Sequence, residues 1–386
     1  MMQGKGPEAL LIYSDALLSY HFHDDHPFNQ LRLKLTLTLL QALELIEDQN
    51  ILPPQMATDA DLLRVHDPQY IESIKRISQT GVATANDLQY GIGTEDVPPF
   101  PGMHEAASLI AGGARLGAEW VMRQPDRHVV FLGGGLHHAF RGKASGFCIY
   151  NDAAVAIQYL LDTYDLKVLY IDTDAHHGDG VQWLFYDDPR VMTVSFHETG
   201  KYLFPGTGHI YERGEGKGYG TKINVPLEPF TEDDSFQHLL EQVLVPVYER
   251  FRPDIVISQN GADAHRFDPL THLSLSMRSY RFIPKLVHEL THAYASGRWL
   301  ALGGGGYDIW RVVPRAWTYL FAEANHTPLI DKDIPSRWRD LWQDKSPVEL
   351  PTRLLDPPFL PIPRRKEINE KNEVTLNRVL SFFQYT

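Results

Sequence analysis

Short β-rich runs alternate with longer helical segments along most of this sequence. Six runs end in glycine or polar residues, at 9–14, 128–135, 167–174, 191–198, 254–263 and 298–306. Segments with helical spacing lie between most of them, at 103–123, 151–164, 232–251 and 276–296. Strands that alternate with helices are typical of crossover connections, which build a parallel sheet covered by helices on both faces. We therefore predict an α/β fold whose ligands lie beyond the carboxyl ends of the strands.

Three further segments define the expected organisation. Residues 31–40 alternate apolar and polar side chains like a strand, but helical spacing continues after them, and we predict one helix over 29–48. Residues 81–102 are typical of a long loop, which is uncommon without a function. From about residue 325 the chain is rich in proline, which predicts an irregular wrap and then a helix near 366–384. We expect a single domain over 1–386, with its core at about 9–320 and the wrap and last helix at about 325–386.

Composition limits the partners of such a domain. The 386-residue chain has a formal net charge of −13 and no long basic run, so we expect no binding to nucleic acid. A single cysteine, Cys148, excludes an intrachain disulfide and fits a reducing compartment. No run approaches the ~18 apolar residues of a membrane span, and the N-terminus lacks a signal-peptide pattern. We expect a cytoplasmic protein that does not bind membranes; its oligomeric state stays open.

The stretch "LYIDTDAHHGDGVQ", residues 169–182, places three aspartates and two histidines at the end of an apolar run. Along a strand, Asp172, Asp174 and His176 would share one face, because side chains alternate. Such crowded charge needs a counter-ion, and mixed imidazole and carboxylate ligands suit Zn²⁺ or Fe²⁺. Asp263, in "SQNGADAHRFDPL", would complete a three-ligand site with an open position for water. For the first motif alone, a solvated polar loop is the alternative.

Two glycine-rich turns add candidate catalytic groups at the same expected edge. "FLGGGLHHAF" supplies adjacent His137 and His138, which we interpret as acid–base groups. "LGGGGYD" supplies Tyr307, whose hydroxyl would stabilise an oxyanion, with the glycines letting it swing towards the site. Asp172 and Asp179 could orient the two histidines. Together these residues predict metal-dependent amide hydrolysis without a covalent intermediate.

Five motifs carry a resemblance to a known family. They are "GGGLHHAFRGKASGFCIYND", "YIDTDAHHGDGVQ", "SFHETGKYLFPGTG", "QNGADAHRFDPL" and "GGGGYD", in family order over roughly residues 20–315. At these motifs the sequence resembles the zinc-dependent histone deacetylase superfamily. The resemblance implies an arginase- and deacetylase-like three-layer α/β/α fold, with a mostly parallel sheet of about eight strands. It also implies that the metal ligands are Asp174, His176 and Asp263.

The resemblance further implies catalytic roles. His138, paired with Asp179, matches the histidine most often given the general base and acid role. His137, paired with Asp172, matches the partner that supplies electrostatic help. Tyr307 matches the residue that polarises the acyl carbonyl.

A third implication concerns substrate binding, by Asp96, Phe147, Phe204, Gly146, Leu270 and Arg32. Phe147 and Phe204 match the aromatic walls of an acyl-lysine channel, which suits the apolar lysine stem. Asp96 matches a loop aspartate that holds the substrate backbone, which would explain the long 81–102 loop. Arg32 matches an arginine of the inner cavity from which acetate leaves.

The family also carries structural K⁺ ions. The implied ligands of the site near the metal are Asp172, Asp174, His176, Ser195 and Phe196. Those of a second site are Phe185, Asp188 and Val191. Where many relatives have a tyrosine in the second site, this chain has Thr221, which puts that site in doubt.

The resemblance implies an acetylated protein as the substrate, with acetyl-CoA synthetase as the candidate, and a role in acetoin or butanediol utilisation. Two alternatives remain within the same fold: an acetylpolyamine deacetylase and an arginase-like dimanganese hydrolase. A third is a binder that senses an acyl ligand without catalysis, against which the sequence retains every residue named above.

Overall fold

One sheet of eight strands runs through the part of the chain that the computed structural model describes, residues 9–383. The strands are β1 (Leu10–Ile12), β2 (Ile51–Leu52), β3 (His128–Phe131), β4 (Val168–Asp172), β5 (Val191–Glu198), β6 (Lys222–Leu227), β7 (Ile255–Gln259) and β8 (Trp299–Leu302). Their order is β2-β1-β3-β8-β7-β4-β5-β6, and all neighbouring pairs are parallel. The predicted parallel α/β sheet of about eight strands is therefore confirmed.

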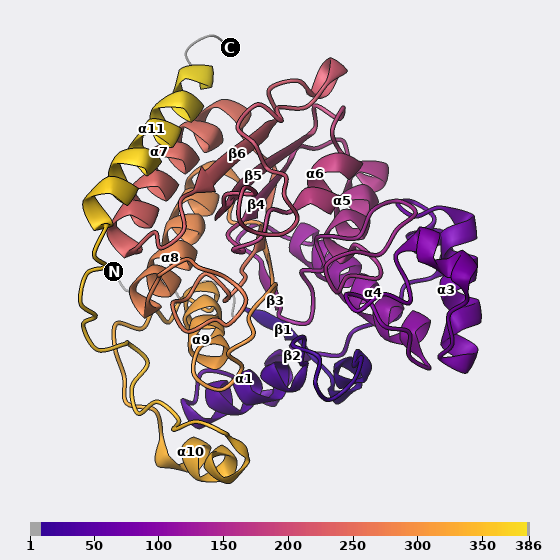
Figure 1. The fold of residues 1–386 in the computed structure, drawn as a ribbon, viewed down its shortest axis with the longest axis horizontal. Coiled ribbons are helices and arrows are strands. Elements are labelled where there is room, and N and C mark those ends of the chain that lie inside the picture. The colour runs from indigo at the N-terminus through magenta and orange to yellow at the C-terminus, as the bar shows by residue number, and fades with distance from the viewer. Residues whose placement is uncertain (1–8, 384–386) are drawn as a thin grey trace.

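Helices cover both faces of this sheet. The α-helices of the described residues are α1 (Leu31–Ala42), α2 (Asp59–Leu62), α3 (Pro68–Thr80), α4 (Met103–Met122), α5 (Asp152–Thr163), α6 (Asp179–Leu184), α7 (Asp233–Phe251), α8 (Met277–Tyr294), α9 (Val313–Ala324), α10 (Ser336–Trp342) and α11 (Arg365–Phe383). Figure 1 shows α4, α5 and α6 on one side of the sheet and α7, α8 and α11 on the other. Within residues 9–383, no helix combines the length and apolar character that crossing a membrane requires.

Each predicted β-rich run contains a strand, but most strands stop before the polar ending of the run. β4 ends at Asp172, β7 at Gln259 and β8 at Leu302. The interiors of β3, β4 and β7 are fully buried, as expected for strands covered on both faces. The glycine and polar endings are therefore free to form loops at one edge of the sheet.

Two strands were not predicted. β2 has only two residues and pairs with β1 at one end of the sheet. β6, at the other end, contains Lys222 and Pro226, which do not resemble an apolar strand. Proline is tolerated there because an edge strand has one side without ladder hydrogen bonds.

The helix predicted over 29–48 is shorter in the structure, since α1 ends at Ala42. Glu44 adopts a left-handed conformation, with φ of 58°, which terminates the helix. Residues 31–40 show a strand-like alternation instead of a helical period because α1 packs against both α9 and α10 and is buried on most sides. A helix without an exposed face shows no amphipathic stripe.

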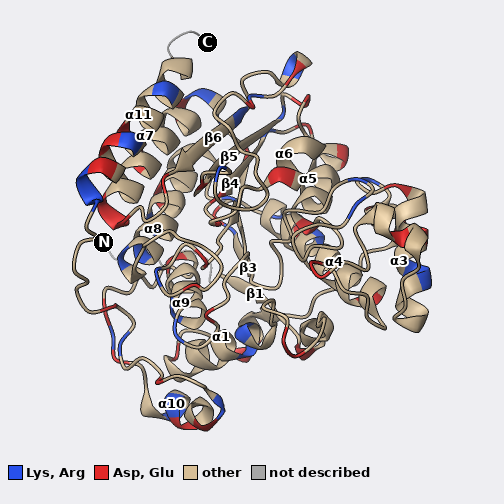
Figure 2. Ribbon diagram, viewed as in Figure 1, with Lys and Arg blue, Asp and Glu red and all other residues tan. Residues whose placement is uncertain are grey.

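The C-terminal segment is tied closely to the rest of the chain. α11 agrees with the helix predicted near 366–384, whose last residue lies outside the described range. Within α11, the buried Asn372 donates from Nδ2 to Thr231 and Ser235 and accepts from the Glu228 backbone. Figure 2 shows acidic and basic residues mixed along α11, where Arg365 pairs with Glu232.

The irregular wrap before α11 carries one buried anchor, Asp356. Its Oδ2 accepts hydrogen bonds from His265 Nε2 at 2.9 Å and from the Met277 backbone at 2.8 Å. Its Oδ1 lies 2.8 Å from Arg315 Nη1. The wrap is thus joined to the loop that follows β7.

Candidate active site

Three buried side chains come together beyond the carboxyl ends of β4 and β7. Asp174, His176 and Asp263 each offer one ligand atom, and these atoms lie within 4.8 Å of one another. His176 Nδ1 lies 2.9 Å from Asp263 Oδ2 and 3.2 Å from Asp174 Oδ1. Two carboxylates and an imidazole are a donor set that fits a catalytic Zn²⁺ or Fe²⁺. The three predicted ligands therefore lie together and suit the expected metal.

The expectation that Asp172 shares a strand face with these ligands is wrong. β4 ends at Asp172, so Asp174 and His176 belong to the loop that follows it. The Oδ2 atom of Asp172 instead lies 2.8 Å from His137 Nδ1. The alternation of side chains along β4 thus does not extend to the candidate ligands, and Asp172 is a hydrogen-bond partner of His137.

The four-glycine run after β8 passes directly over the ligand carboxylates. A Cβ atom on Gly305 would lie 2.1 Å from Asp263 Oδ2, a contact that no side chain could tolerate. The backbone N–H of Gly305 donates to Asp174 Oδ2 at 2.6 Å. The close approach of the backbone to the carboxylates therefore requires glycine here.

The adjacent histidines are each held by one aspartate. His138 Nδ1 lies 2.7 Å from Asp179 Oδ1, just as His137 Nδ1 is paired with Asp172. An ionised carboxylate accepts only, so both histidines carry a hydrogen on Nδ1, and whichever of them is neutral keeps Nε2 as an acceptor. His137 Nε2 lies 3.9 Å from Asp174 Oδ1. Both predicted pairs are present, beside the three candidate ligands.

Their surroundings move the two histidine pKa values in opposite directions. Burial alone would lower the pKa of His137, but Asp172 and Asp174 outweigh it and raise this pKa to about 9. Burial and the adjacent His137 together lower the pKa of His138 to about 4, against the opposing effect of Asp179. At neutral pH, His138 is therefore the free base of the pair.

Tyr307 follows the glycine run, and two residues fix the turn. The Tyr307 backbone N–H donates to Asp268 Oδ2 at 2.8 Å. The buried Arg32 donates from Nη1 to the Gly306 carbonyl at 3.1 Å. The Tyr307 ring centroid lies 6.4 Å from that of His176. Burial raises the pKa of Tyr307 well above its usual value, so the hydroxyl keeps its proton.

Two aromatic rings flank these groups. The Phe204 ring centroid lies 5.0 Å from that of His138, and the Phe147 centroid lies 5.9 Å from that of Tyr307. Phe204 is 45% exposed, and Phe147 is half-buried. Each of the two predicted wall residues therefore lies beside one of the candidate catalytic groups.

The turn at Gly146 links Asp96 to His138. Asp96 Oδ2 accepts a hydrogen bond from the Gly146 backbone at 2.7 Å. A Cβ atom on Gly146 would lie 2.3 Å from the His138 ring, and Gly146 itself has a positive φ of 54°. Asp96 therefore holds the backbone on which the His138 ring rests. Leu270, also expected near the substrate, lies in the Asp268 loop, and its N–H donates to Asp268 Oδ1 at 3.0 Å.

The sheet places part of the expected first K⁺ site side by side. Asp172 on β4 is the register partner of Ser195 on β5, and Phe196 follows on the same strand. Asp174 and His176 lie in the loop beyond β4.

At the expected second K⁺ site, backbone oxygens already accept hydrogen bonds. The Phe185 carbonyl accepts from the Asp188 N–H, and the Asp188 carbonyl accepts from the Val191 N–H. The buried Lys222 donates from Nζ to the Val191 carbonyl at 2.5 Å and to Thr221 Oγ1 at 2.9 Å. A lysine amine from β6, whose pKa burial lowers to about 7, thus contacts one of the expected ligands.

Several residues that position the site were missed from the sequence. Asn151 donates from Nδ2 to the carbonyls of His137 and Ala139, and the next residue, Asp152, accepts from the backbone of Gly135. Asn151 is also the N-cap of α5, which is the signal that could have found it. Asp268, in the loop after β7, accepts from the Tyr307 backbone, and no pattern in the sequence indicates this contact.

Comparison with known proteins adds independent evidence. Residues 26–324 match the histone deacetylase domain. The chain belongs to the histone deacetylase family. Membership in this family identifies it as a hydrolase of the deacetylase type, and the metal that the family uses fits Asp174, His176 and Asp263.

Relatives within the histone deacetylase family are similar over almost the whole chain. The acetoin utilization protein AcuC of Bacillus subtilis (strain 168) is 52% identical over 377 residues, covering 97% of each chain. AcuC of Staphylococcus aureus (strain MRSA252) is 46% identical over 387 residues, covering 100% of both. Crystal structures of an HDAC homolog complexed with SAHA and of one from Aquifex aeolicus both give a TM-score of 0.84, at 30% and 29% identity. Each covers 95% of this chain and is itself covered completely.

Proposed function

We propose that this protein is a metal-dependent lysine deacetylase that hydrolyses the acetamide of acetyl-lysine in a protein. One observation carries the proposal: two His–Asp pairs and Tyr307 lie around a buried set of three candidate metal ligands. Family membership gives the reaction type, and the geometry supplies the groups that it needs. Zinc is the proposed metal, with Fe²⁺ as the alternative that the same donor set accepts.

Asp174, His176 and Asp263 would hold the metal, which when bound polarises the acyl carbonyl and lowers the pKa of a water molecule. The other residues move and stabilise charge. The neutral His138, held through Nδ1 by Asp179, accepts the proton of the attacking water at Nε2 and returns it to the departing lysine amine. His137, with its raised pKa, adds positive charge beside the reacting carbonyl. The protonated hydroxyl of Tyr307 donates to the developing oxyanion.

Phe147 and Phe204 would enclose the methylene stem of acetyl-lysine. The stem is apolar and the amide at its tip is polar, so a slot between aromatic rings orients the amide towards the histidines. Asp96 would hold the substrate backbone at the rim while its second oxygen anchors Gly146. Arg32, behind the glycine run, would attract the acetate product.

We propose a role in acetoin or butanediol utilisation, because the similar proteins of B. subtilis and S. aureus carry acetoin utilization in their names. Acetyl-CoA synthetase is the proposed protein substrate, as the sequence resemblance implies. Deacetylation would then restore the lysine that this synthetase needs.

Release of acetate from an acetyl-lysine peptide tests the proposal. Purified protein is stripped of metal, refilled with Zn²⁺ or Fe²⁺, and compared with the Tyr307→Phe variant. We expect activity to return with the metal and to collapse in the variant. No acetate under any loading, with the fold intact by circular dichroism, would overturn the lysine deacetylase assignment. Acetylated polyamines and guanidino substrates with Mn²⁺, assayed in parallel, distinguish the two alternatives within this fold.

A further inference from the structure

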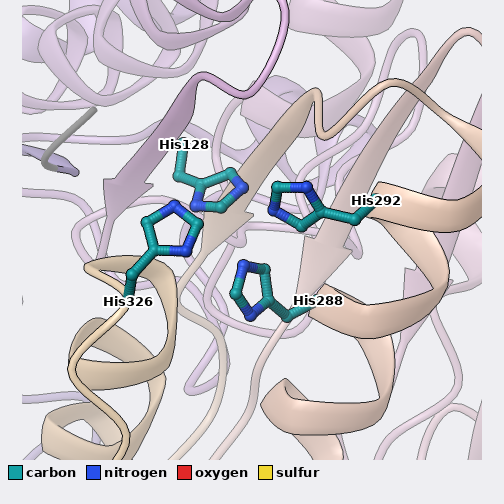
Figure 3. A group of neighbouring side chains, drawn as sticks. All are labelled: His128, His288, His292 and His326. Atoms are coloured by element: carbon teal, nitrogen blue, oxygen red, sulfur yellow. The ribbon is translucent and has the colours of Figure 1, made fainter. Parts of the chain in front are cut away.

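Four histidine side chains converge at the end of the sheet opposite the candidate active site. His128 is the first residue of β3, His288 and His292 lie one turn apart on α8, and His326 follows α9. Figure 3 shows the four rings turned towards a common point. Each ring offers one nitrogen, and these nitrogens lie within 4.8 Å of one another. Three segments that are distant in the sequence thus contribute to one cluster.

Polar groups around the cluster orient three of the rings. The Nδ1 atom of His128 lies 2.6 Å from the Ala324 carbonyl, that of His288 3.1 Å from Glu323 Oε1, and that of His292 3.3 Å from Asp126 Oδ1. Carbonyl and carboxylate oxygens only accept, so these Nδ1 atoms carry the hydrogens. Each Nε2 is then left with a lone pair, which is the form that binds a metal.

The Nε2 atoms are the unusual feature. In all four histidines this atom is buried and, within residues 9–383, has no hydrogen-bond partner. His128 itself is 0% exposed. An unsatisfied buried acceptor destabilises the fold, so four in one place need a partner. His288 stacks on Trp299, with centroids 5.9 Å apart, but stacking does not satisfy a lone pair in the plane of the ring.

We infer that these four histidines bind one divalent transition-metal ion, zinc by ligand chemistry, in a second site separate from the catalytic ligands. Four neutral imidazoles suit the tetrahedral coordination of zinc. Bonds of about 2.0–2.1 Å place tetrahedral ligands about 3.4 Å apart, so the rings close in by a small movement on binding. Carboxylates and a carbonyl on the far side of the rings complete the arrangement typical of zinc-bound histidine.

The site is structural rather than catalytic. Four protein ligands leave no open position for water. His288 and His292 belong to the string "HELTH", which has the H-E-x-x-H spacing of metalloproteases. Its glutamate, Glu289, is instead 57% exposed and pairs with Lys285 at 3.2 Å. The ion would join β3, α8 and the segment after α9, and thereby fix the start of the C-terminal wrap.

Counting zinc in the full-length protein tests this inference. Metal-stripped protein is refilled with Zn²⁺, and we expect about two ions per chain, one for each ligand set. His292→Ala should lower the count to about one, lower the thermal midpoint in zinc, and leave acetate release unchanged. His238→Ala, a half-exposed histidine on α7, is the matched control and should keep both ions.

The second site can also be isolated. Asp263→Asn disables the catalytic set, so its remaining zinc should show nitrogen-only coordination by X-ray absorption. Adding His292→Ala should remove that zinc, and Asp126→Asn should weaken it about 10–100-fold by releasing an orienting contact. The inference is wrong if wild type and His292→Ala hold equal zinc, or if the Asp263→Asn protein, folded by circular dichroism, holds none. Zinc content decides this whether or not the protein releases acetate.

Discussion

The rings of His137 and His138 lie 3.9 Å apart, centroid to centroid, yet their pKa values are displaced in opposite directions. His137 faces two carboxylates, Asp172 and Asp174, and holds a proton up to a pKa of about 9. His138 has only Asp179, and burial beside the charged His137 keeps it neutral. One member of the pair is thereby a fixed positive charge, and the other is a base.

This division of roles predicts what the loss of His138 does to catalysis. His138→Ala should lower kcat about 10²–10⁴-fold with little change in KM, because it removes the group that transfers protons. The bound metal should stay the same, since His138 is not among the three ligands. Steady-state kinetics with an acetyl-lysine peptide, together with metal content, check this. A variant that keeps wild-type kcat would assign the base elsewhere.

Tyr307 offers a second test, with a positioning residue as comparison. Tyr307→Phe should lower kcat about 10²–10³-fold through loss of an oxyanion donor. Asp268→Asn should have a smaller effect of the same kind. Its single remaining carboxamide oxygen cannot accept from both the Tyr307 and Leu270 backbones, as the carboxylate does. If Asp268→Asn keeps the kcat of the wild-type protein, the turn at Tyr307 does not need Asp268 as an anchor.

His66 predicts part of the pH dependence of stability. It is buried, accepts from the Asn151 backbone at Nε2, and has a pKa lowered by burial from 6.5 to about 4. Between these values the unfolded chain binds the proton and the folded chain does not. The contribution of His66 to the free energy of unfolding is therefore complete above pH 6.5. It falls by on the order of 3 kcal/mol as the pH drops towards 4.

Urea unfolding of wild type and His66→Gln across this pH window checks the sign. Glutamine does not titrate, so the stability difference between the two proteins should shrink as the pH falls. A difference that stays constant from pH 7 to 4 would mean that His66 does not contribute.

Lys222 yields a prediction about K⁺. Its amine nitrogen donates to the Val191 carbonyl, which the family resemblance assigns to the second cation site. Lys222→Ser should open that carbonyl to solvent cations, so KCl should raise the unfolding midpoint of the variant more than that of wild type. NaCl at equal ionic strength controls for general salt effects. An identical K⁺ response in both proteins would contradict a cation-replacing role for Lys222.

The sequence alone was sufficient for features that are local. The runs before Asp172 and Gln259 are continuous and apolar, and the strands β4 and β7 were predictable from them. α1 was harder to delimit because its burial on most sides hides the helical period. β6 was missed because Lys222 and Pro226 are acceptable only at that edge of the sheet.

The contacts that tune the site depend on segments far apart in the chain. Asp268 reaches the Tyr307 backbone, and Asp356 reaches His265, only after the sheet has formed. The four-histidine cluster likewise assembles from three segments, of which only "HELTH" has a readable spacing. Family motifs gave the ligands and the His–Asp pairs, but no motif marks these longer-range partners.

Because Asp356 ties the wrap to the domain, the part of the chain that unfolds as one unit extends beyond the region that matches the histone deacetylase domain. The histone deacetylase match ends at residue 324, and Asp356 lies beyond it. A protein trimmed to that boundary would leave Arg315 buried without its carboxylate and His265 without its acceptor, two residues from the candidate ligand Asp263. Proteolytic nicking in the wrap would therefore loosen contacts beside the candidate metal ligands, although the cut lies outside the region that matches the histone deacetylase domain.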